Sequence, residues 1–310
     1  MLTRTATLTP VAPFDFEKTA RYATHGGGDD AAQSYDLSRF TRLLEIDGYP
    51  ILATLFSSGS IEAPCLDVTL TANRLSGKWV PRLMDQVSRL LGVDQDLAGF
   101  YAMASGDPLL ASLVTQLRGL HLPQTNSIHE SIVQSIIGQQ ISAKVARMVR
   151  SLLVQMYGAT LTVDGATYHG FPSPQALVAA GVQGLREVKL SQRKAEYIVD
   201  ISRAVVSGML NLEDLRMLHD DEVVDQVVKL RGVGTWTAQW LLVNALGRED
   251  GFPSGDLMLQ KILVAAGANP VMDRDAALRY STRWSPYRSY ATIYLFAGLQ
   301  SGHLREFGLG

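Results

Sequence analysis

The sequence predicts an α+β fold that is mainly α-helical, with an N-terminal antiparallel β-sheet domain followed by two helical subdomains. Two observations predict it. Alternating and β-branched segments separated by turn residues fill residues 35–70, whereas from residue 108 onward nearly every segment has an apolar period close to 3.6. With 310 residues, 46% of them hydrophobic, the chain can bury two or three cores. We expect units at 1–105, at 128–248, and at 106–127 combined with 249–310.

The expected sheet is an antiparallel meander. Residues 40–46 and 51–56 alternate as strands do, and Asp47-Gly48 between them suits a tight hairpin turn. A third strand is expected at 66–70, after the turn-forming residues 57–59.

Most other segments are expected to be helical, because their apolar residues recur every three to four positions. The exception is 158–173, rich in Gly and Thr, which is predicted to be a loop or an irregular crossing. Two consecutive helices are predicted to bury apolar faces, one with Ile128, Ile132 and Ile136, the next with Ile141, Val145, Met148, Leu152 and Met156. The other predicted helices span 79–91, 96–103, 174–180, 193–206, 220–229, 236–246 and 256–266.

Cysteine usage and the terminal sequence indicate the cellular setting. The single Cys65 excludes an internal disulfide, and no cluster of Cys and His has the spacing of a zinc or iron–sulfur site. This favours a reducing, cytoplasmic location. No apolar run approaches the ~20 residues of a membrane span, and residues 1–12 lack the features of a signal peptide. We therefore expect a soluble protein that does not contact a membrane.

The net charge argues mildly against a nucleic-acid partner. The formal charge is −2 and the pI is about 6.3, whereas dedicated DNA-binding proteins are usually basic. Affinity for DNA would therefore have to come from local geometry.

The most informative segment is residues 230–238, Leu-Arg-Gly-Val-Gly-Thr-Trp-Thr-Ala, which separates two helical patterns. Gly232 and Gly234 are expected to let the backbone turn with positive φ, so that the second helix begins with its free N–H groups exposed. Such a helix end can hold a phosphate without any lysine, because its unpaired donors carry partial positive charge. A lone Gly-x-Gly is equally compatible with an ordinary corner between two helices.

Two further segments bear on that alternative. Asp256 follows Pro253-Ser254-Gly255 at the start of a predicted helix, about twenty residues beyond the hairpin. For an isolated Asp at such a place, the commonest role is a helix N-cap. Residues 138–142, Gly-Gln-Gln-Ile-Ser, place paired amides between two amphipathic helices. Amides can fill a gap in a base stack or hydrogen-bond base edges, but they also suit a polar helix junction.

Together these segments resemble the helix-hairpin-helix DNA glycosylases, and within that superfamily the AlkA-type 3-methyladenine DNA glycosylases. The resemblance lies in the Leu-x-Gly-Val-Gly-x-x-Thr-Ala hairpin, the Asp beyond it and the Gly-Gln-Gln-Ile-Ser turn. Trp-Thr-Ala at 236–238 and Arg-Trp-Ser-Pro-Tyr-Arg-Ser-Tyr-Ala at 283–291 match the alkylation-repair branch. The likeness covers residues 108–300, whereas over 1–105 it rests on Pro-Phe-Asp-Phe at 13–16 and on the expected sheet.

The resemblance implies a role for each matched residue. Asp256 falls at the position of the catalytic carboxylate, and one Asp can also cap the helix. Gln140 falls where a side chain fills the vacated base stack, with Gln139 beside it. The hairpin that binds the DNA backbone comprises Gly232, Val233 and Gly234, with Thr237 behind them. The pocket for the extruded base comprises Trp236, Trp240, Leu257 and Phe296, with Tyr22 reaching in from the N-terminal domain.

One position distinguishes the chemistries of the superfamily. Members that also nick the strand carry a lysine where this chain has Trp236, because an amine must attack the sugar to form a Schiff base. The resemblance therefore implies simple hydrolysis, in which Asp256 stabilises an oxocarbenium-like sugar and activates water. A base alkylated at a ring nitrogen is already cationic, so it leaves without a general acid, and aromatic walls attract it.

The substrate range depends on the pocket. Leu257 stands where well-known members have an aromatic residue, which leaves the width of the pocket open. A wider pocket would admit 1-methyladenine or 3-methylcytosine beside 3-methyladenine and 7-methylguanine.

The implied partner is double-stranded DNA that contains alkylated bases. The resemblance also implies a monomeric protein of bacterial type that acts in the cytoplasm, at the nucleoid. No cofactor is required, but family members can hold a structural Na⁺ or K⁺ ion with hairpin carbonyls, here those of Val228, Leu230 and Val233. Two other classes stay open on the residues alone. A non-catalytic helix-hairpin-helix module would use Asp256 only as a cap, and a metabolic α+β enzyme would use the hairpin only for packing.

Overall fold

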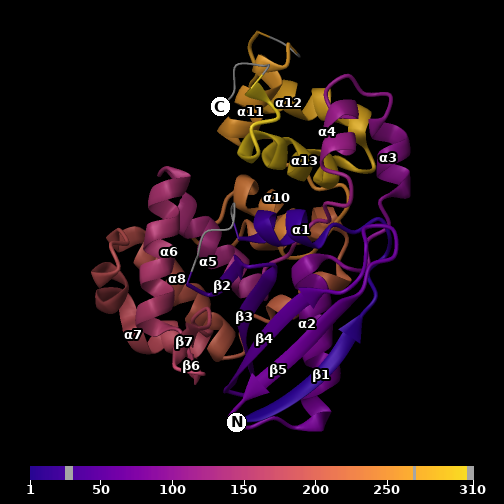
Figure 1. Cartoon of the computed structure of the whole chain (residues 1–310). Helices are drawn as coiled ribbons and strands as arrows, with labels where there is room; N and C mark the ends of the chain where they lie inside the picture. Colours follow the sequence, from indigo (N-terminus) through magenta and orange to yellow (C-terminus); the bar gives the residue numbers. More distant parts are fainter. Residues whose placement is uncertain (25–30, 268–269, 306–310) are drawn as a thin grey trace.

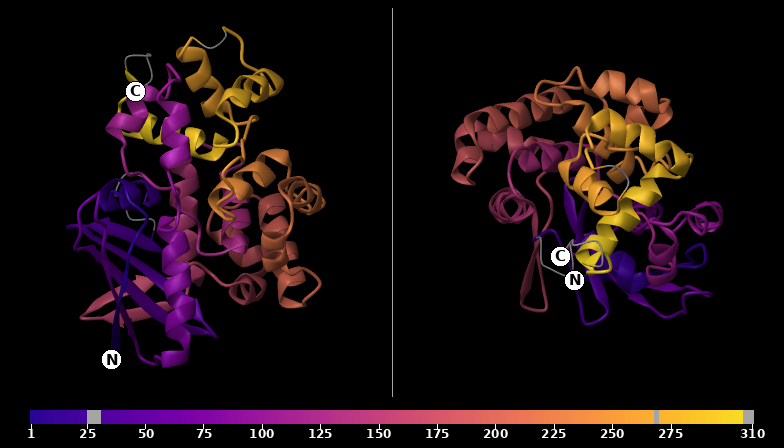
Figure 2. Two further views of the ribbon diagram at one scale, coloured as in Figure 1. Left: turned by 90° about the vertical axis from the view of Figure 1, so that its right-hand side faces the viewer. Right: turned by 90° about the horizontal axis from the view of Figure 1, so that it is seen from above.

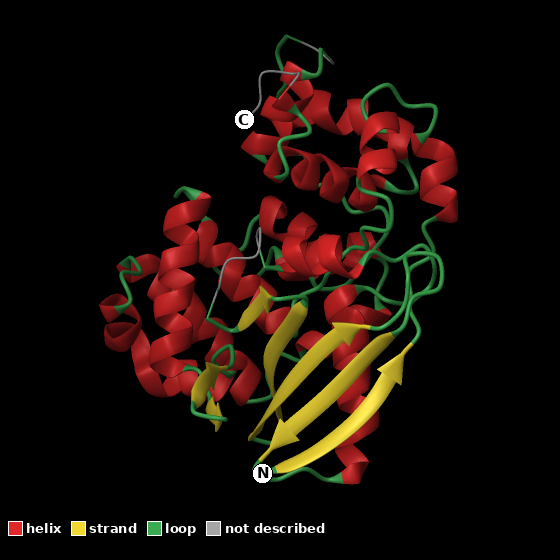
Figure 3. Cartoon of the chain, viewed as in Figure 1, coloured by secondary structure: helices red, strands yellow, loops and turns green. Residues whose placement is uncertain are grey.

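The computed structural model describes residues 1–24, 31–267 and 270–305. An antiparallel sheet forms the N-terminal part, and the rest is mainly helical (Figures 1 and 3). The predicted fold class is therefore confirmed. Within the described ranges, no helix combines the length and the apolar character that a membrane span requires.

The sheet has five strands in the order β1-β5-β4-β3-β2, and all neighbouring pairs are antiparallel. The predicted meander corresponds to β3 (Arg39–Ile46), β4 (Tyr49–Ser57) and β5 (Leu66–Ala72), preceded by β2 (Gln33–Asp36). The edge strand β1 (Leu2–Leu8) was not predicted. Its sequence, Leu-Thr-Arg-Thr-Ala-Thr-Leu, is mostly polar, which suits an edge strand that buries little surface. The strand therefore lacks the apolar alternation by which the other strands were predicted.

Opposite faces of the sheet are covered by different elements. The helices α1 (Phe16–Ala23) and α2 (Val80–Leu91) share one hydrophobic core with the sheet. The other face is partly covered by a hairpin of β6 (Thr160–Val163) and β7 (Ala166–His169), whose Leu161 packs with Leu43 and Leu52.

The β6–β7 hairpin shows that the prediction of an irregular 158–173 segment was wrong. Asp164-Gly165 forms its turn, and both residues have positive φ, 49° and 82°. The sequence carries the signal, because Asp-Gly stands between two alternating runs, the pattern that favours a two-residue hairpin.

The remaining helices lie largely where the apolar period predicted them. Helix α7 is longer than predicted and continues past Gly181, where the backbone is locally non-helical with φ 63°. The helices are α3 (Ala98–Ala104), α4 (Ala111–Gln116), α5 (Ile128–Gly138), α6 (Ala143–Tyr157), α7 (Pro174–Glu187), α8 (Gln192–Val206), α9 (Asp220–Val227), α10 (Thr235–Asn244), α11 (Leu257–Ala265), α12 (Arg274–Ser281) and α13 (Arg288–Gln300). Short 3₁₀ turns are η1 (Gly77–Trp79), η2 (Leu212–Met217) and η3 (Thr282–Trp284).

The helices pack into two groups. One group buries α5 to α10, and the other combines α3 and α4 with α11 to α13, far along the chain (Figures 1 and 2). Phe100 and Ala104 of α3 pack in the second group, although their segment falls within the predicted N-terminal unit. Helix α10 contributes to both, with Ala238 and Leu241 in the first and Val243 in the second. It therefore lies at the boundary between the groups.

The predicted buried face of α6 is wrong. Ile141, Val145, Met148 and Met156 are 38%, 41%, 42% and 54% exposed, and Leu152 is half-buried. The helix buries Val149, Leu153 and Val154 instead. Apolar residues cover more than one stripe of this helix, and periodicity does not say which stripe contacts the core.

A buried ion pair connects the sheet to the first helical group. Arg42 of β3 donates from Nη2 to Oε2 of Glu130 in α5 at 2.6 Å, and both side chains are at most 3% exposed. Gln134 donates to the other carboxylate oxygen of Glu130 at 2.8 Å. Separating the two charges would leave each one buried without a counter-charge, which is strongly destabilising. The ion pair therefore fixes α5 relative to the sheet.

Candidate active site

Asp256 lies at the end of a loop that is tied down on both sides. Phe252 N donates to the Gln239 side chain at 3.1 Å, so the loop is fixed to α10. Ser289, in the first turn of α13, donates from N to Glu249 O at 2.8 Å and from Oγ to Gly251 O at 3.1 Å. The loop is thereby held between two helices.

Residues 283–291, part of the resemblance, strengthen this anchorage. Arg288 donates to both carboxylate oxygens of Asp250, from Nε and Nη2, at 2.8 Å each, and Ser285 Oγ donates to Oδ2 at 2.9 Å. Burial acts to raise the pKa of Asp250, but these hydrogen bonds outweigh it, so the pKa lies below its ordinary value. The run thus positions the Asp256 loop.

The Asp256 carboxylate accepts hydrogen bonds on both oxygens. Oδ1 accepts from Met258 N at 2.9 Å and Leu259 N at 3.1 Å, which confirms the N-cap interpretation. Oδ2 accepts from the indole Nε1 atoms of Trp236 at 3.0 Å and Trp240 at 3.2 Å. The two tryptophans are four residues apart and therefore share one face of α10. Four N–H donors fix the orientation of the carboxylate.

Aromatic side chains surround this carboxylate. Trp240 packs against Phe296 of α13, with ring centroids 5.4 Å apart. The pKa of Tyr22 lies above its ordinary value, mainly because the phenol is buried and also because of the negative charge of Asp256. Tyr22 packs against the core of the second helical group, as Trp240 and Phe296 do. Leu257, by contrast, is 72% exposed at the first residue of α11.

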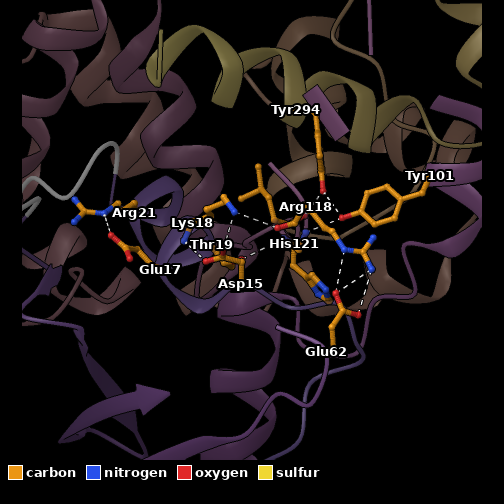
Figure 4. A network of polar contacts seen from close by, with 12 residues as sticks. Asp15, Glu17, Lys18, Thr19, Arg21, Glu62, Tyr101, Arg118, His121 and Tyr294 are labelled. Atoms are coloured by element: carbon orange, nitrogen blue, oxygen red, sulfur yellow. Dashed lines mark hydrogen bonds and ion pairs between the residues drawn. The ribbon is translucent and has the colours of Figure 1, made fainter. Parts of the chain in front are cut away.

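Helix α1 carries Tyr22 and is anchored to the segment before α5 (Figure 4). Asp15 caps the helix by accepting from Lys18 N at 2.9 Å, and Asp15 N donates to Gly119 O at 2.8 Å. His121 N donates to Thr19 Oγ1 at 3.2 Å. The N-terminal domain therefore contributes Tyr22, on a fixed helix, to the core against which Trp240 and Phe296 also pack.

The two hairpin glycines have different conformations. Gly232 has φ +87°, and a Cβ there would lie 2.1 Å from Cδ2 of Tyr197. Gly234 has φ −109°, so the prediction of positive φ at this residue was wrong. It is the extended N-cap of α10, is exposed, and a Cβ on it would have no atom within 4 Å. The start of α10 is therefore open, with Val233 and the Thr237 side chain buried behind it.

The turn between α5 and α6 contains both predicted stack-filling residues. Gln140 is exposed and adopts φ +58°, which is uncommon for a residue with a side chain. Gln139 instead donates from Nε2 to Gly232 O at 2.8 Å, so its amide is directed to the hairpin. Lys194, which sequence reasoning missed, donates to Ile137 O at 2.9 Å and Gln139 O at 2.6 Å. Its partners are 57 and 55 residues away, beyond any local pattern.

The carbonyls of Val228, Leu230 and Val233 suit a hard monovalent cation by their chemistry. They lie at and just beyond the end of α9, where helix carbonyls lack intrahelical partners. Leu230 O accepts from Val233 N at 3.0 Å and keeps a second lone pair. The Thr237 hydroxyl, in the first turn of α10, is buried without a hydrogen-bond partner. Within the described ranges, His, Cys, Asp and Glu form no cluster suited to a metal ion.

A cavity of about 480 Å³ lies away from these residues, between α2 and the start of α5. Its lining includes Arg89, Arg216, Glu45 and His129. Desolvation lowers the pKa of His129 to about 4, and its Nε2 lies 2.9 Å from Ser202 Oγ. The predicted site residues do not line this cavity.

Comparisons with known proteins show the family and the fold of the chain. Residues 133–284 match the HhH-GPD superfamily of base excision DNA repair proteins. The DNA-3-methyladenine glycosylase of Bacillus subtilis is 30% identical over 205 residues, which cover 66% of this chain and 68% of that protein. A probable N-glycosylase/DNA lyase of Methanothermobacter thermautotrophicus is 23% identical over 97% of this chain and 96% of its own length. A solved 3-methyladenine DNA-glycosylase from Archaeoglobus fulgidus has the same fold, with a TM-score of 0.82 at 24% identity, covering 94% of this chain and 98% of that one.

The fold and the hairpin followed by an aspartate define a helix-hairpin-helix base excision protein. The chain belongs to the HhH-GPD superfamily, in the branch of the AlkA-type DNA glycosylases, which are hydrolases of N-glycosyl bonds.

Proposed function

We propose that the protein is a monofunctional DNA glycosylase that flips alkylated bases out of duplex DNA and hydrolyses their N-glycosidic bond with Asp256. The observation that carries this proposal is the position of the Asp256 carboxylate, oriented by two indole N–H groups among partly exposed aromatic rings. A capping carboxylate can have its second oxygen held by an indole at a buried structural position, as Asp107 has by Trp284. Asp256 is only partly buried and lies beside partly exposed rings, and this accessibility distinguishes the proposal from a non-catalytic DNA-binding module.

The hydrogen bonds on Oδ2 favour an electrostatic role over a covalent one. An oxygen that already accepts two N–H groups is a weaker nucleophile, yet its negative charge still stabilises a cation nearby. At ~4 Å and an effective dielectric constant of about 20, this attraction is worth about 4 kcal/mol. Asp256 would stabilise the oxocarbenium-like sugar in this way and orient the attacking water.

The nature of the site favours cationic leaving groups. Two indoles donate to Asp256, Phe296 packs against Trp240, and Tyr22 packs against the same core, and a phenol is a weak general acid at neutral pH. A neutral base needs a proton to leave, whereas a base alkylated at a ring nitrogen does not. The aromatic faces of Trp240 and Phe296 would also attract a cationic base. These points support 3-methyladenine and 7-methylguanine as substrates, with 1-methyladenine and 3-methylcytosine as further candidates.

Two elements would contact the DNA, namely the hairpin and the turn that carries Gln140. The open start of α10 at Gly234 offers unpaired N–H groups to a backbone phosphate, which needs no net positive charge on the protein. A Na⁺ or K⁺ ion on the carbonyls of Val228, Leu230 and Val233 would stabilise the hairpin. Gln140, exposed at its turn, would fill the space of the extruded base, which lowers the cost of flipping.

Incubation with randomly methylated duplex DNA tests the proposal. We expect chromatography to detect free 3-methyladenine and 7-methylguanine, released faster than a neutral base such as hypoxanthine from a matched duplex. Duplex binding without release of any free base would contradict the proposal and favour the non-catalytic module. Absence of both binding and release would favour an enzyme of another class.

A further inference from the structure

Helix α8 contacts both DNA-facing elements of the proposed site. Lys194 reaches the turn between α5 and α6, where its Nζ donates to the carbonyls of Ile137 and Gln139. Three residues later on α8, the Tyr197 ring packs against Gly232 of the hairpin. Residues three apart lie on one helix face, so one side of α8 supports the turn and the hairpin together.

The contact of Lys194 is with the C-terminal end of a helix. Ile137 lies in the last turn of α5, and Gln139 is its C-cap. Carbonyl groups at this end carry partial negative charge and lack intrahelical partners, so a cation that donates to them is stabilising. The Lys194 side chain is half-buried, and its partners are fixed main-chain atoms. This arrangement holds the end of α5 in place.

A second hydrogen bond connects the turn directly to the hairpin. The Gln139 amide donates to Gly232 O at 2.8 Å, across 93 residues of sequence. The hairpin is also fixed to α8 by Arg231, which lies over the Tyr197 ring at 5.1 Å and forms ion pairs with Glu196 and Asp200. The turn, the hairpin and α8 are therefore one connected polar unit.

Gln140 follows immediately in the left-handed conformation, with φ +58°. A residue with a side chain adopts this conformation rarely, and it persists only where the surrounding structure determines it. On the far side of the turn, Ser142 caps α6 by accepting from Val145 N. The backbone of Gln140 is thus held between two fixed helix ends.

We propose that Lys194 and Gln139 are positioning residues that fix the position of Gln140 relative to the hairpin. Binding of the DNA backbone by the hairpin and insertion of Gln140 into the base stack would then occur in one step. This inference rests on the proposed function and deepens it. Neither Lys194 nor Gln139 needs to contact DNA for this purpose. Phosphate binding at the start of α10 then places Gln140 against the stack without a separate rearrangement.

The test uses a duplex in which 2-aminopurine lies beside a tetrahydrofuran abasic analogue. Insertion of Gln140 restacks the neighbouring fluorophore, so the wild-type protein should quench its fluorescence. In Lys194→Met the quenching at saturating protein should fall to the level of Gln140→Ala. The single-turnover rate of base release should fall about tenfold, which is the change expected when hydrogen bonding worth about 1.4 kcal/mol no longer positions Gln140.

The same variants distinguish positioning from DNA contact. The affinity of Lys194→Met for undamaged duplex should change less than about twofold, and its salt dependence should match the wild-type slope. A lysine that contacts a phosphate would lower that slope by about one unit. Lys78→Met, which removes an exposed charge in the N-terminal domain, is the control for net charge.

Gln139→Met removes the other half of the link and serves if Lys194→Met is unstable. It should reduce quenching similarly, and the double variant should be no worse than either single variant. Wild-type quenching in both single variants, or a reduced salt slope in Lys194→Met, would overturn the inference. The abasic analogue has no base to release, so the wild-type fluorescence change is measurable even if the proposed excision fails.

Discussion

Asp256→Asn should lower the single-turnover rate of base release by about 10³-fold, while binding to duplex DNA remains measurable. Loss of about 4 kcal/mol of attraction to the sugar cation accounts for this magnitude. The rate is measured with protein in excess over a duplex that carries a single 7-methylguanine. Binding is measured on the same duplex by fluorescence anisotropy.

The structure adds a stability cost to this variant. An Asn side chain has one acceptor oxygen, which can serve either the main-chain donors of Met258 and Leu259 or the indoles of Trp236 and Trp240, but not both pairs. Unsatisfied donors cost about 1–3 kcal/mol. The melting temperature should fall by a few degrees, so binding and rate are compared well below it.

Asp107 provides a matched control. Its Oδ1 accepts from Leu109 N and Leu110 N at 2.9 and 3.1 Å, and its Oδ2 accepts from the Trp284 indole at 2.8 Å. Asp107→Asn therefore makes the same chemical change at a buried structural position. It should lose similar stability and keep near-normal excision. A comparable loss of excision in both variants, or near-normal excision in Asp256→Asn, would remove Asp256 from the chemistry.

Substitutions at the two hairpin glycines should differ in their effects on stability. Gly232→Ala requires positive φ and forces a Cβ into the Tyr197 ring, which Arg231 covers. We expect a loss of about 2–4 kcal/mol in the free energy of unfolding. Gly234→Ala meets no atom and has ordinary φ, so restriction of the unfolded chain favours it by about 0.4–1 kcal/mol. Alanine is a poorer N-cap than glycine by a comparable amount, so the free energy of unfolding should change little.

DNA binding gives the decisive contrast for this pair. Gly234→Ala should fold well yet bind any duplex about fivefold more weakly, because its methyl group occupies the space above the N–H groups of α10. The defect should be equal for damaged and undamaged DNA. Wild-type affinity in Gly234→Ala would place the phosphate elsewhere, and a defect confined to one lesion would mean that the hairpin reads bases. Denaturant unfolding and anisotropy titrations give both quantities.

The sequence predicted most of what depends on local patterns. The antiparallel strands, the amphipathic helices, the hairpin and the Asp256 cap all follow from residues close together in the chain. The exposed Gln140 is also a local feature. The β6–β7 hairpin was missed although Asp164-Gly165 indicates it.

Features that depend on distant contacts were not predictable in this way. The sequence predicted Trp236 and Trp240 as walls of the base pocket. It did not predict that both indoles donate to Asp256, because that contact exists only in the folded chain. In the sequence, nothing distinguishes Lys194 from other helical lysines. Its contact with α5 becomes visible only when α5 packs beside α8. The conformation of Gly234 and the exposed face of α6 likewise depend on which neighbours the fold supplies.

The most direct test of hydrolysis by Asp256 is analysis of the DNA strand after excision with borohydride present. Trp236 offers no amine, and Lys229 and Lys261, the lysines nearest the motif in sequence, are exposed. Lys194 has a pKa lowered by burial, but its amine donates to two carbonyls. We predict a full-length strand with one abasic site and no covalent protein–DNA adduct. An adduct that is trapped by borohydride and lost in Lys229→Ala, Lys261→Ala or Lys194→Ala would contradict the hydrolytic mechanism.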